Sequence, residues 1–375
     1  MVAPVHAPIR RSDLVSNDVN IALTMFAETL LEQFHGFQDP QVVQLGLQEI
    51  SGALNFKYPI SVGSAAFSQL INGIKYRAVA ELMLPIFSDI FADGVHAEVR
   101  KLQSDAWTGW GMQPREMAMA ARILPERLLA TAVEAGEATA SVENYVDGDT
   151  SSSAIKFFAK NKPVDPLGNS SATYDNLFTG AASGAYPGAL PLNLANIDKV
   201  WQLSQTIKSQ NGVDYRPLEW KWVLVSKSQE LLARRLFEDQ GNANDYVRDT
   251  SGTSTAELMV ANTAKKHKIQ VIASPYLTVT DTWYPIFATP TLEKAPWVTL
   301  VQTPANAVPF AGAIPGSPDG STDPGFEWII DDLTSEMYKR GIPGGVPAGH
   351  VAIAAKRIVG VALTAPWQMF KCKAA

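Results

Sequence analysis

The sequence contains a single cysteine, Cys372, in 375 residues. One cysteine excludes an internal disulfide and any zinc site built from several thiolates, so the fold is expected to be stable without cross-links. The 5 histidines stand singly along the chain, and a lone histidine is far more often a surface or core residue than a ligand or a base. We therefore expect no metal site, no cofactor and no catalytic histidine.

Charged residues are also scarce, at 18% of the chain against roughly 25% in an average globular protein. Hydrophobic residues make up 46%, which indicates that part of the polar surface is replaced by contact surface between subunits. The net charge is −6, and the densest basic patch is only Lys265-Lys266-His267-Lys268. The charge distribution of a dedicated nucleic-acid-binding protein is therefore missing.

Long hydrophobic runs are absent, since no stretch reaches the roughly 18 apolar residues that a membrane span needs. The first residues, Met1 to Val15, contain Arg10 and Arg11. They lack the apolar segment of roughly 7 to 15 residues that a secretory signal has. We expect a soluble, cytoplasmic product with no membrane partner.

Known catalytic motifs are missing as well. The glycine spacings of a phosphate-binding loop and of a dinucleotide site do not occur, nor do the patterns G-x-S-x-G and H-E-x-x-H. His96 and Glu98 match half of a zinc deaminase motif, whose other half requires two cysteines. Asp331 and Asp332 are consecutive in an expected strand, so their side chains point to opposite faces and do not share a metal. We expect that the protein is not an enzyme.

Proline, glycine and tryptophan are plentiful, at 24, 26 and 9 residues, which favours loops and extended arms over a compact helical bundle. Asn17 or Asp18 can cap a helix whose apolar residues recur every three or four positions up to Gly36: Val19, Leu23, Phe26, Leu30 and Phe34. Residues 40–50 predict a second short helix, with Val43, Leu47 and Ile50 in register. The two helices together are typical of an N-terminal arm.

Residues 72–107 show a different pattern, in which charged and apolar residues alternate. The alternation predicts a long two-stranded excursion that turns near residues 91–94. Such a ribbon is marginally stable alone and needs a partner surface. Two tryptophans follow it and either anchor a neighbouring subunit or fill the protein's own core. The candidate inter-subunit contacts are Lys75, Arg77, Glu81, Asp89, Asp93, Glu98, Arg100, Lys101, Trp107 and Trp110.

The strongest helical pattern begins at Pro114 and ends at Gly136. Pro125 removes a backbone donor in its middle, so we expect a kink or two abutting helices. The predicted apolar face of the helix that begins at Pro114 consists of Met117, Ala121, Leu124, Leu128 and Ala132.

Residues 147–176 are expected to be mostly loop, with one strand at residues 155–159.

From Gly188 onward helical and strand patterns alternate and predict an α/β subdomain. A Pro/Gly-rich loop at residues 304–324 follows, and a turn at residues 344–349 joins two strands that return to a shared sheet. The expected helices are 193–209 and 229–237, the second with Leu232 and Leu236 on one face, and the expected strands are 220–225, 269–273, 282–288, 297–302, 326–331 and 350–367.

The order of these elements resembles that of the major capsid proteins of tailed bacteriophages, which have the α+β Hong Kong 97-type fold, and in particular the Mu-like major head proteins. The resemblance covers nearly all of the chain and is best between Tyr174 and Leu277. The matching stretches are Phe157-Phe158 through Pro163, Asp175-Asn176-Leu177-Phe178-Thr179-Gly180, Trp222-Val223-Leu224-Val225, Val271-Ile272-Ala273-Ser274-Pro275-Tyr276-Leu277, Asp281-Thr282-Trp283-Tyr284, and Gly360-Val361-Ala362 with Trp367.

The resemblance also implies a division of the chain into the parts that this family has. These are an N-terminal arm with its lead-in at residues 1–71, an extended loop at 72–112, a peripheral domain with a spine helix at 113–188, an axial domain at 189–325, and return strands of the peripheral domain at 326–375.

The function that the resemblance implies is structural. Subunits assemble as hexamers and pentamers into an icosahedral phage head, which is built in the host cytoplasm, becomes part of the virion and encloses double-stranded DNA contacted non-specifically. The implied partners are a separate scaffolding protein, a portal and a decoration protein. Some members link neighbouring subunits through a lysine, for which Lys75 is the candidate here. A mildly acidic wall agrees with this role, because strong DNA binding hinders packing and ejection.

Three other interpretations stay open at this point. An encapsulin-type nanocompartment shares the fold and encloses enzyme cargo instead of DNA, although those chains are typically shorter. An α/β enzyme would have its site at the strand ends within residues 190–300, where such folds bind ligands. Another structural protein of the virion or tail differs from a capsid subunit in the shape of the particle.

Overall fold

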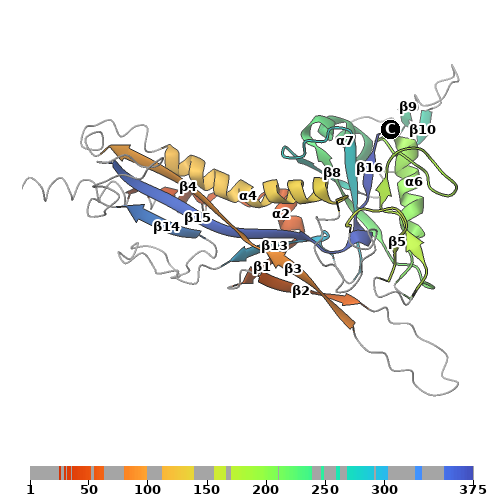
Figure 1. Cartoon of the computed structure of the whole chain (residues 1–375). Helices are drawn as coiled ribbons and strands as arrows, with labels where there is room; N and C mark the ends of the chain where they lie inside the picture. Colours follow the sequence, from red (N-terminus) through yellow and green to blue (C-terminus); the bar gives the residue numbers. More distant parts are fainter. Residues whose placement is uncertain are drawn as a thin grey trace, which may run out of the picture.

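The computed structural model describes residues 25–26, 29–30, 32–34, 36–51, 55–62, 80–98, 112–138, 156–165, 170–209, 211–238, 246–248, 259–261, 268–290, 293–302, 326–331 and 350–374. Figure 1 shows an elongated part, built from a long sheet and one long helix, joined at one end to a compact α/β part. Helices and mainly antiparallel sheets are both present, so the predicted α+β class is confirmed.

The elongated part is formed by the spine sheet, which we define as strands β1, β4, β13, β14 and β15. Its central strand, β15 (His350–Leu363), pairs antiparallel with β4 (Asp89–Glu98) along one edge. Along the other edge it pairs antiparallel with β14 (Phe326–Asp331) and then with β13 (Trp297–Gln302). Strand β1 (Leu47–Ser51) lies parallel to β13. The sheet therefore joins segments from both ends of the chain.

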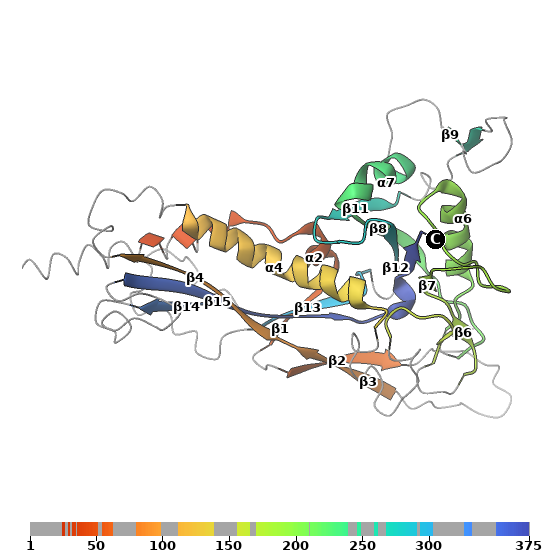
Figure 2. The same ribbon diagram turned by 45° about the horizontal axis from the view of Figure 1, so that its top comes forward.

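Helix α4 (Gln113–Ala135) packs along β15 and ends at Gly136, as predicted (Figure 2). Its predicted buried face was largely wrong, because only Met117 of that set is buried and the other four residues are half-buried. The face is rotated because α4 is covered by the α/β part as well as by the sheet, and it includes a glutamate that a search for apolar periodicity leaves out. The buried residues are Pro114, Met117, Ala118, Pro125, Glu126, Leu129, Ala130 and Val133.

Pro125 lies inside one continuous helix of 23 residues, so of the two predicted alternatives, a kink or two abutting helices, the second does not occur. Proline has no N–H, and the carbonyl four residues earlier, that of Ala121, therefore loses its intrahelical donor. The Nη1 group of Arg357, a buried residue of β15, donates to the Ala121 carbonyl. A side chain from the sheet thus replaces the missing backbone bond, and the helix continues through the proline.

The N-terminal stripe is confirmed where the structure describes it, since the residues at 25–26, 29–30 and 32–34 are helical and Phe26, Leu30 and Phe34 are buried. The second helix, α2 (Gln41–Leu45), is shorter than predicted, because Leu47 and Ile50 belong to strand β1. Gly46 separates helix from strand with an extended backbone. A Cβ atom at this position would collide with the indole of Trp297, so the chain passes the tryptophan only as glycine.

The predicted turn at residues 91–94 was wrong, because these residues lie in the middle of β4 and pair with β15. The two-stranded ribbon is formed instead by β2 (Asn55–Val62) and β3 (Ala80–Phe87), and Ser88 alone separates β3 from β4. An alternating pattern fits a ribbon and a strand with one exposed face equally well. The segment that joins β2 to β3 lies outside the described residues.

The compact part, called the α/β unit below, contains a sheet in the order β11-β8-β12-β16-β7. Its strands are β7 (Leu177–Phe178), β8 (Glu219–Ser226), β11 (Gln270–Ser274), β12 (Thr282–Ala288) and β16 (Lys371–Lys373). Its helices are α6 (Leu194–Gln205), which the Asn193 side chain caps, and α7 (Glu230–Phe237), which follows a 3-10 turn at Lys227–Gln229. The predicted helices and the first three strands of this region are confirmed.

Other assignments changed. β13, expected in the α/β subdomain, belongs to the spine sheet, and β16, expected with the return strands, lies between β12 and β7. The strand predicted at 155–159 is a loop in the described residues 156–159, although Phe157 and Phe158 are buried there. Leu232 and Leu236 lie one helical turn apart in α7, as predicted, but only Leu236 is buried, whereas Leu232 is exposed.

Shorter elements complete the description. β5 (Lys162–Pro163) pairs with β6 (Thr173–Tyr174), and β9 (Tyr246–Arg248) pairs with β10 (Met259–Ala261). After β15 the chain forms a 3-10 turn at Pro366–Gln368, so the last predicted strand ends earlier than expected. The predicted loop at 304–324 and the predicted turn at 344–349 lie outside the described residues.

One hydrophobic core joins the two parts. It combines Leu129 and Val133 of α4 with Trp297 of β13 and Tyr284 of β12. A second core, which includes Trp220 and other aromatic side chains, fills the α/β unit. Because the first core takes residues from both sheets, the elongated part and the α/β unit pack directly against each other.

Candidate assembly surfaces

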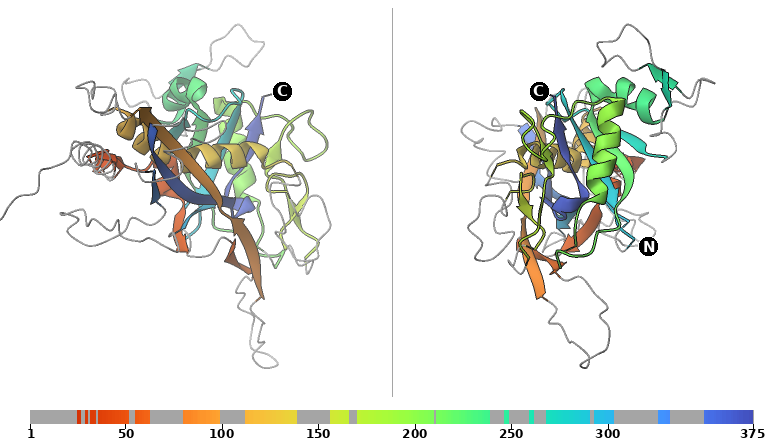
Figure 3. Two further views of the ribbon diagram at one scale, coloured as in Figure 1. Left: turned by 60° about the vertical axis from the view of Figure 1, so that its left-hand side comes forward. Right: turned by 90° about the vertical axis from the view of Figure 1, so that its right-hand side faces the viewer.

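The ribbon of β2 and β3 stands apart from the two larger sheets of the described chain, although β3 also contacts β15. β2 pairs only with β3, and both strands leave the body in Figure 1 and in the left view of Figure 3. Each strand has 8 residues, or roughly 27 Å at about 3.4 Å per residue. A two-stranded ribbon of this length is marginal in water unless one of its faces is covered.

The register of the ribbon gathers apolar residues on one face and leaves polar and apolar residues mixed on the other, which includes the pairs Asn55–Phe87 and Pro59–Met83. Residues directly opposite each other share one face, and the faces alternate along the strands. The intervening pairs include Lys57–Pro85 and Ser61–Glu81. Of the described side chains, Ile86 at the base is buried against Val298 and Leu300 of the spine sheet. The register places one set of apolar pairs on the same face of the ribbon: Phe56–Ile86, Tyr58–Leu84, Ile60–Leu82 and Val62–Ala80.

Strand β4 carries a second exposed surface. Ile90 is 58% exposed, and Ala92, Asp93, Gly94 and His96 are exposed as well. Arg357, which pairs with Phe91 in the register, reaches helix α4, so the alternate positions 90, 92, 94 and 96 lie on the face away from that helix. This face of the spine sheet has no helix over it in the described part of the chain.

Only some of the contact residues predicted from the sequence lie in the part of the chain that the structure describes. Glu81 lies on the ribbon strand β3, whereas Asp89 and Asp93 are exposed on β4 and Glu98 is half-buried at its end. The predicted hairpin residues are therefore divided between the ribbon and the spine sheet. The other candidates, Lys75, Arg77, Arg100, Lys101, Trp107 and Trp110, lie outside the described residues.

The N-terminal segment is fastened to α4 by Arg122, a residue that the sequence analysis missed. Its Nε donates to the carbonyl of Phe34 at 2.7 Å, its Nη1 lies 3.1 Å from Oδ1 of Asp39, and its guanidinium stands 3.8 Å from the centroid of the Phe34 ring. Arg357 approaches the same ring at 5.3 Å. An arginine on a helix surface gives no sequence signal of this kind, because its partners lie more than 80 residues away.

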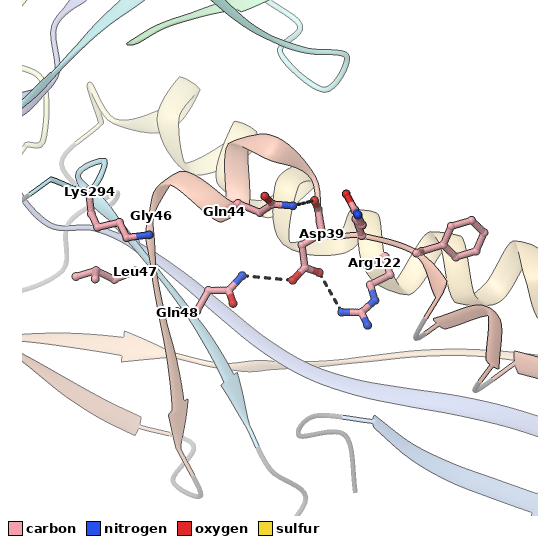
Figure 4. A pocket seen from close by; sticks show the side chains of 9 residues that line it. Asp39, Gln44, Gly46, Leu47, Gln48, Arg122 and Lys294 are labelled. Carbon is pink, nitrogen blue, oxygen red and sulfur yellow. Dashed lines mark hydrogen bonds and ion pairs between the residues drawn. The ribbon is translucent and has the colours of Figure 1, made fainter. Parts of the chain in front are cut away.

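A polar groove of about 630 Å³ adjoins this contact (Figure 4). Asp39 accepts from Arg122 on one side and from the Gln48 amide at 3.4 Å on the other, while Lys294 lies at the far end. Leu47 and Gln48 belong to β1, so the groove opens beside the edge of the spine sheet. Within its lining, Gln44, Gln48 and Arg122 all donate hydrogen bonds to Asp39.

The C-terminal half of α4 is bound to the α/β unit by glutamates. Glu126 accepts from the Ser274 hydroxyl at 2.7 Å. Glu134 accepts from the backbone N–H groups of Thr278 and Val279 at 2.5 and 2.9 Å and from the Thr278 hydroxyl at 2.8 Å. These bonds fix the position of the helix relative to the α/β unit.

Glu137 completes this set at the end of the helix. Its carboxylate lies 2.8 Å from Nζ of Lys371 and 2.7 Å from Nζ of Lys373, both on the C-terminal strand β16. Lys371 also donates to the Glu134 carbonyl at 2.8 Å. Burial lowers the pKa of Lys371, which is only 2% exposed, and the ion pair with Glu137 opposes that shift. The C-terminal strand is therefore attached to α4 by charge as well as to its sheet.

The pH dependence of stability follows from two of these carboxyl groups. Burial favours protonation of Glu137, but the bonds from Lys371 and Lys373 bring its pKa below the ordinary 4.5. Its contribution to stability is present above about pH 4.5 and is lost as the pH falls through the folded-state pKa. Burial raises the pKa of Glu126, and the Ser274 bond only partly opposes this. Its contribution is present below the unfolded pKa and is lost as the pH rises through the folded one.

We expect opposite results from neutralising these two groups. Glu137→Gln lowers the free energy of unfolding at pH 7 and weakens its fall on acidification, because the ion pairs are gone before titration begins. Glu126→Gln keeps an acceptor for Ser274 without the buried charge, so stability at pH 7 stays equal or rises. Urea unfolding of both variants between pH 4 and pH 7 measures this. Equal responses of the two variants would contradict the assignment.

Neither a metal site nor a membrane span emerges from the described residues. No cluster of three or more His, Cys, Asp or Glu side chains there could hold a metal ion. His96 and His350 pack edge to face, with ring centroids 5.2 Å apart, as a pair on the spine sheet. No helix in the described ranges is long and apolar enough to cross a membrane.

Comparison with known proteins gives structural likeness without sequence likeness. No protein-family model matches the chain, and no curated protein is similar to it in sequence. The capsid of the cyanophage P-SCSP1u is 10% identical, with a TM-score of 0.47, and the similarity covers 90% of this chain and 89% of that one. The procapsid of bacteriophage JBD30 is 11% identical, with a TM-score of 0.46, covering 94% and 75%. The holo-SrpI encapsulin complex of Synechococcus elongatus PCC 7942 is 8% identical, with a TM-score of 0.42, covering 88% and 86%.

Proposed function

We propose that this chain is the structural subunit of a closed icosahedral shell, a phage head that encloses double-stranded DNA. The observation that carries the proposal is the ribbon of β2 and β3, which projects from the body and has one apolar face by register. A ribbon with such a face is stable when another molecule covers the apolar side chains and removes them from water. In a shell built from identical subunits, the molecule that covers the ribbon is a second copy of the chain.

The shape of the subunit supports this role. A shell that closes by rotation repeats heterologous contacts, so each subunit needs several different surfaces rather than one self-complementary patch. The chain offers the ribbon, the exposed face of β4 and the exposed side of the α/β unit at different places. The proposed contact residues remain those of the ribbon and its surroundings, with Glu81 on the ribbon and Asp89, Asp93 and Glu98 on the adjoining strand. Hexamers and pentamers are the proposed intermediate rings.

The proposed division of the chain follows the strands. Residues 55–87 act as the extended loop, the spine sheet with α4 acts as the peripheral domain, and the α/β unit, including the C-terminal strand β16, acts as the axial domain. This division differs from the boundaries drawn from the sequence and is proposed in their place. Residues 25–45 act as the arm that the Arg122 contact fastens to α4.

The proposed role is structural and not enzymatic. The proposed partners are further copies of the chain, a scaffolding protein, a portal, a decoration protein and the packaged duplex, and the proposed place of assembly is the host cytoplasm. The net charge of −6 supports a wall that does not bind the duplex tightly. If purified particles contain enzyme cargo and no DNA, the encapsulin alternative replaces the phage head.

The ribbon provides the first test. Leu84→Asp puts a charge on the apolar face of the ribbon and is expected to leave a folded subunit that forms no shells, because the covering copy would bury an unpaired charge. Met83→Asp, at the next position along the same strand, falls on the opposite face and is the matched control that still assembles. Circular dichroism and sedimentation velocity measure folding and assembly. Normal shells from the Leu84 variant would contradict the role given to the ribbon.

A further inference from the structure

The α/β unit exposes large apolar side chains at two separate places. Of the described residues, Val213 and Tyr215 are 75% and 63% exposed in the connection before β8, and Leu231 and Leu232 are 63% and 46% exposed at the start of α7. Paired apolar side chains at this exposure mark contact sites more often than scattered single ones do.

The first place is a turn that includes Ser209 and residues 211–216 and is held by internal hydrogen bonds. The Asn211 side chain accepts from the N–H groups of Val213 and Asp214 at 3.0 Å each and donates to the Asp214 carboxylate at 2.5 Å. Gly212 takes a positive φ of 71°, which a residue with a side chain rarely adopts.

The base of this turn is anchored as well. The backbone N–H of Ser209 donates to the carbonyl of Asp214 at 2.6 Å, and Lys208 and Tyr215 form an antiparallel β-bridge. The Arg216 guanidinium stands 4.1 Å from the Trp367 ring centroid. A surface that is already ordered loses little entropy on binding, and tyrosine is a frequent anchor of interfaces. The turn therefore presents Val213 and Tyr215 in a conformation suited to docking.

The second place lies at the opposite end of strand β8. The turn that carries Val213 and Tyr215 comes before Glu219, the first residue of β8. Ser226, the last residue of β8, is followed by the 3-10 turn at Lys227–Gln229, which leads directly into α7. Eight strand residues span on the order of 25 Å. α7 packs on the edge strand β11, on the outside of the unit (Figure 2). The two apolar places of one subunit therefore do not meet each other.

Charge distinguishes the two places. The tip of the turn carries the exposed carboxylate of Asp214, while the cations Lys208 and Arg216 at its base are half-buried. On α7, Arg234 is paired with Glu230 and Glu238, and Arg235 is exposed one helical turn from Leu231. An acidic apolar tip and a basic apolar patch are complementary in sign and in apolar character, which favours one orientation of approach. Two different complementary surfaces on one chain generate a ring when the contact repeats by rotation.

We propose that Val213 and Tyr215 of one copy dock on Leu231 and Leu232 of the next copy, with Asp214 facing Arg235, and that this contact closes the rings of subunits. The inference rests on the proposed shell-forming function and names the surfaces that its rings use. The occupant of each patch is a second copy of this chain.

Charge exchange tests the pairing. Val213→Lys alone and Leu231→Glu alone are each expected to raise the protein concentration needed for assembly by about tenfold or more, which corresponds to roughly 1.4 kcal/mol. The two changes in one chain restore assembly, because lysine and glutamate then face each other. Lys199→Glu, an exposed charge change on α6, is the control that assembles like the original protein. Unfolding curves of all four variants establish that the subunit is folded.

A cross-link gives the second readout. Val213→Cys with Leu231→Cys cannot close within one subunit, because a disulfide needs Cα atoms within about 7 Å. Under oxidation the double variant is expected to form a ladder of covalent oligomers up to the ring size, while each single variant stays at most dimeric. Cys372 does not interfere, because it is fully buried.

The outcomes separate this inference from the proposed function. A ladder together with rescue by charge exchange supports the pairing. Shells that form normally from every single variant, with no ladder, overturn the pairing and leave the shell function intact. Single variants that fail without rescue and without a ladder also overturn it, because the tip then docks elsewhere. An original protein that never assembles overturns both.

Discussion

Leu129→Asp is expected to abolish folding of the subunit. Leu129 is fully buried in the core that joins α4 to both sheets. Removing a buried leucine costs about 2–5 kcal/mol, and an unpaired charge in its place adds several more. The sum reaches the total stability of a typical domain, about 5–15 kcal/mol. Circular dichroism and the soluble fraction after expression measure the result.

Leu128→Asp is the matched control for this variant. Leu128 belongs to the helix face predicted from the sequence, but its side chain is half-buried. Its aspartate reaches water and is expected to lower stability without abolishing folding. A folded, stable Leu129 variant together with an unfolded Leu128 variant would show that α4 is rotated, with Leu128 and not Leu129 in the core.

Arg357→Leu is expected to destabilise the subunit by about 2–4 kcal/mol. The substitution leaves the Ala121 carbonyl, which Pro125 has already deprived of its helical donor, without the bond from Arg357. A buried acceptor without a partner costs about 1–3 kcal/mol, and the half-buried carbonyl of Ala121 falls in the lower part of this range. The lost packing of the Arg357 side chain, which is 6% exposed, adds to that cost. Chemical denaturation measures the difference.

A double-mutant cycle with Pro125→Ala separates these causes. Alanine at position 125 restores the backbone N–H that bonds to the Ala121 carbonyl. In that background Arg357→Leu is expected to cost at least about 1 kcal/mol less, because the carbonyl is already satisfied. The same cost in both backgrounds would mean that Arg357 stabilises the protein by packing alone and not by replacing the missing helical bond.

Local sequence patterns predicted the elements whose signal lies within one element. The spine helix from Pro114 to Gly136, the helix α6 and the strands β8 and β12 each follow from residues close in sequence. The stripe of Phe26, Leu30 and Phe34 belongs to the same class. Propensity and periodicity act over one or two turns, so they describe elements and not their neighbours.

The pairings of strands could not be predicted in this way. β1 lies beside β13, some 250 residues later, and Gly46 is required there by the indole of Trp297. β4 pairs with β15 and not with β3, although either pairing fits its alternating residues. In the sequence, Glu126, Glu134 and Glu137 cannot be told from the exposed glutamates of a helical pattern. Their partners on the α/β unit become visible only in the structure.

Electron microscopy of the purified, full-length protein, expressed alone and together with the products of its neighbouring genes, tests the shell-forming function most directly. We expect rings of five and six subunits and closed icosahedral shells, with double-stranded DNA inside the particles made during infection. A monomer or dimer of uniform size under every condition would contradict it.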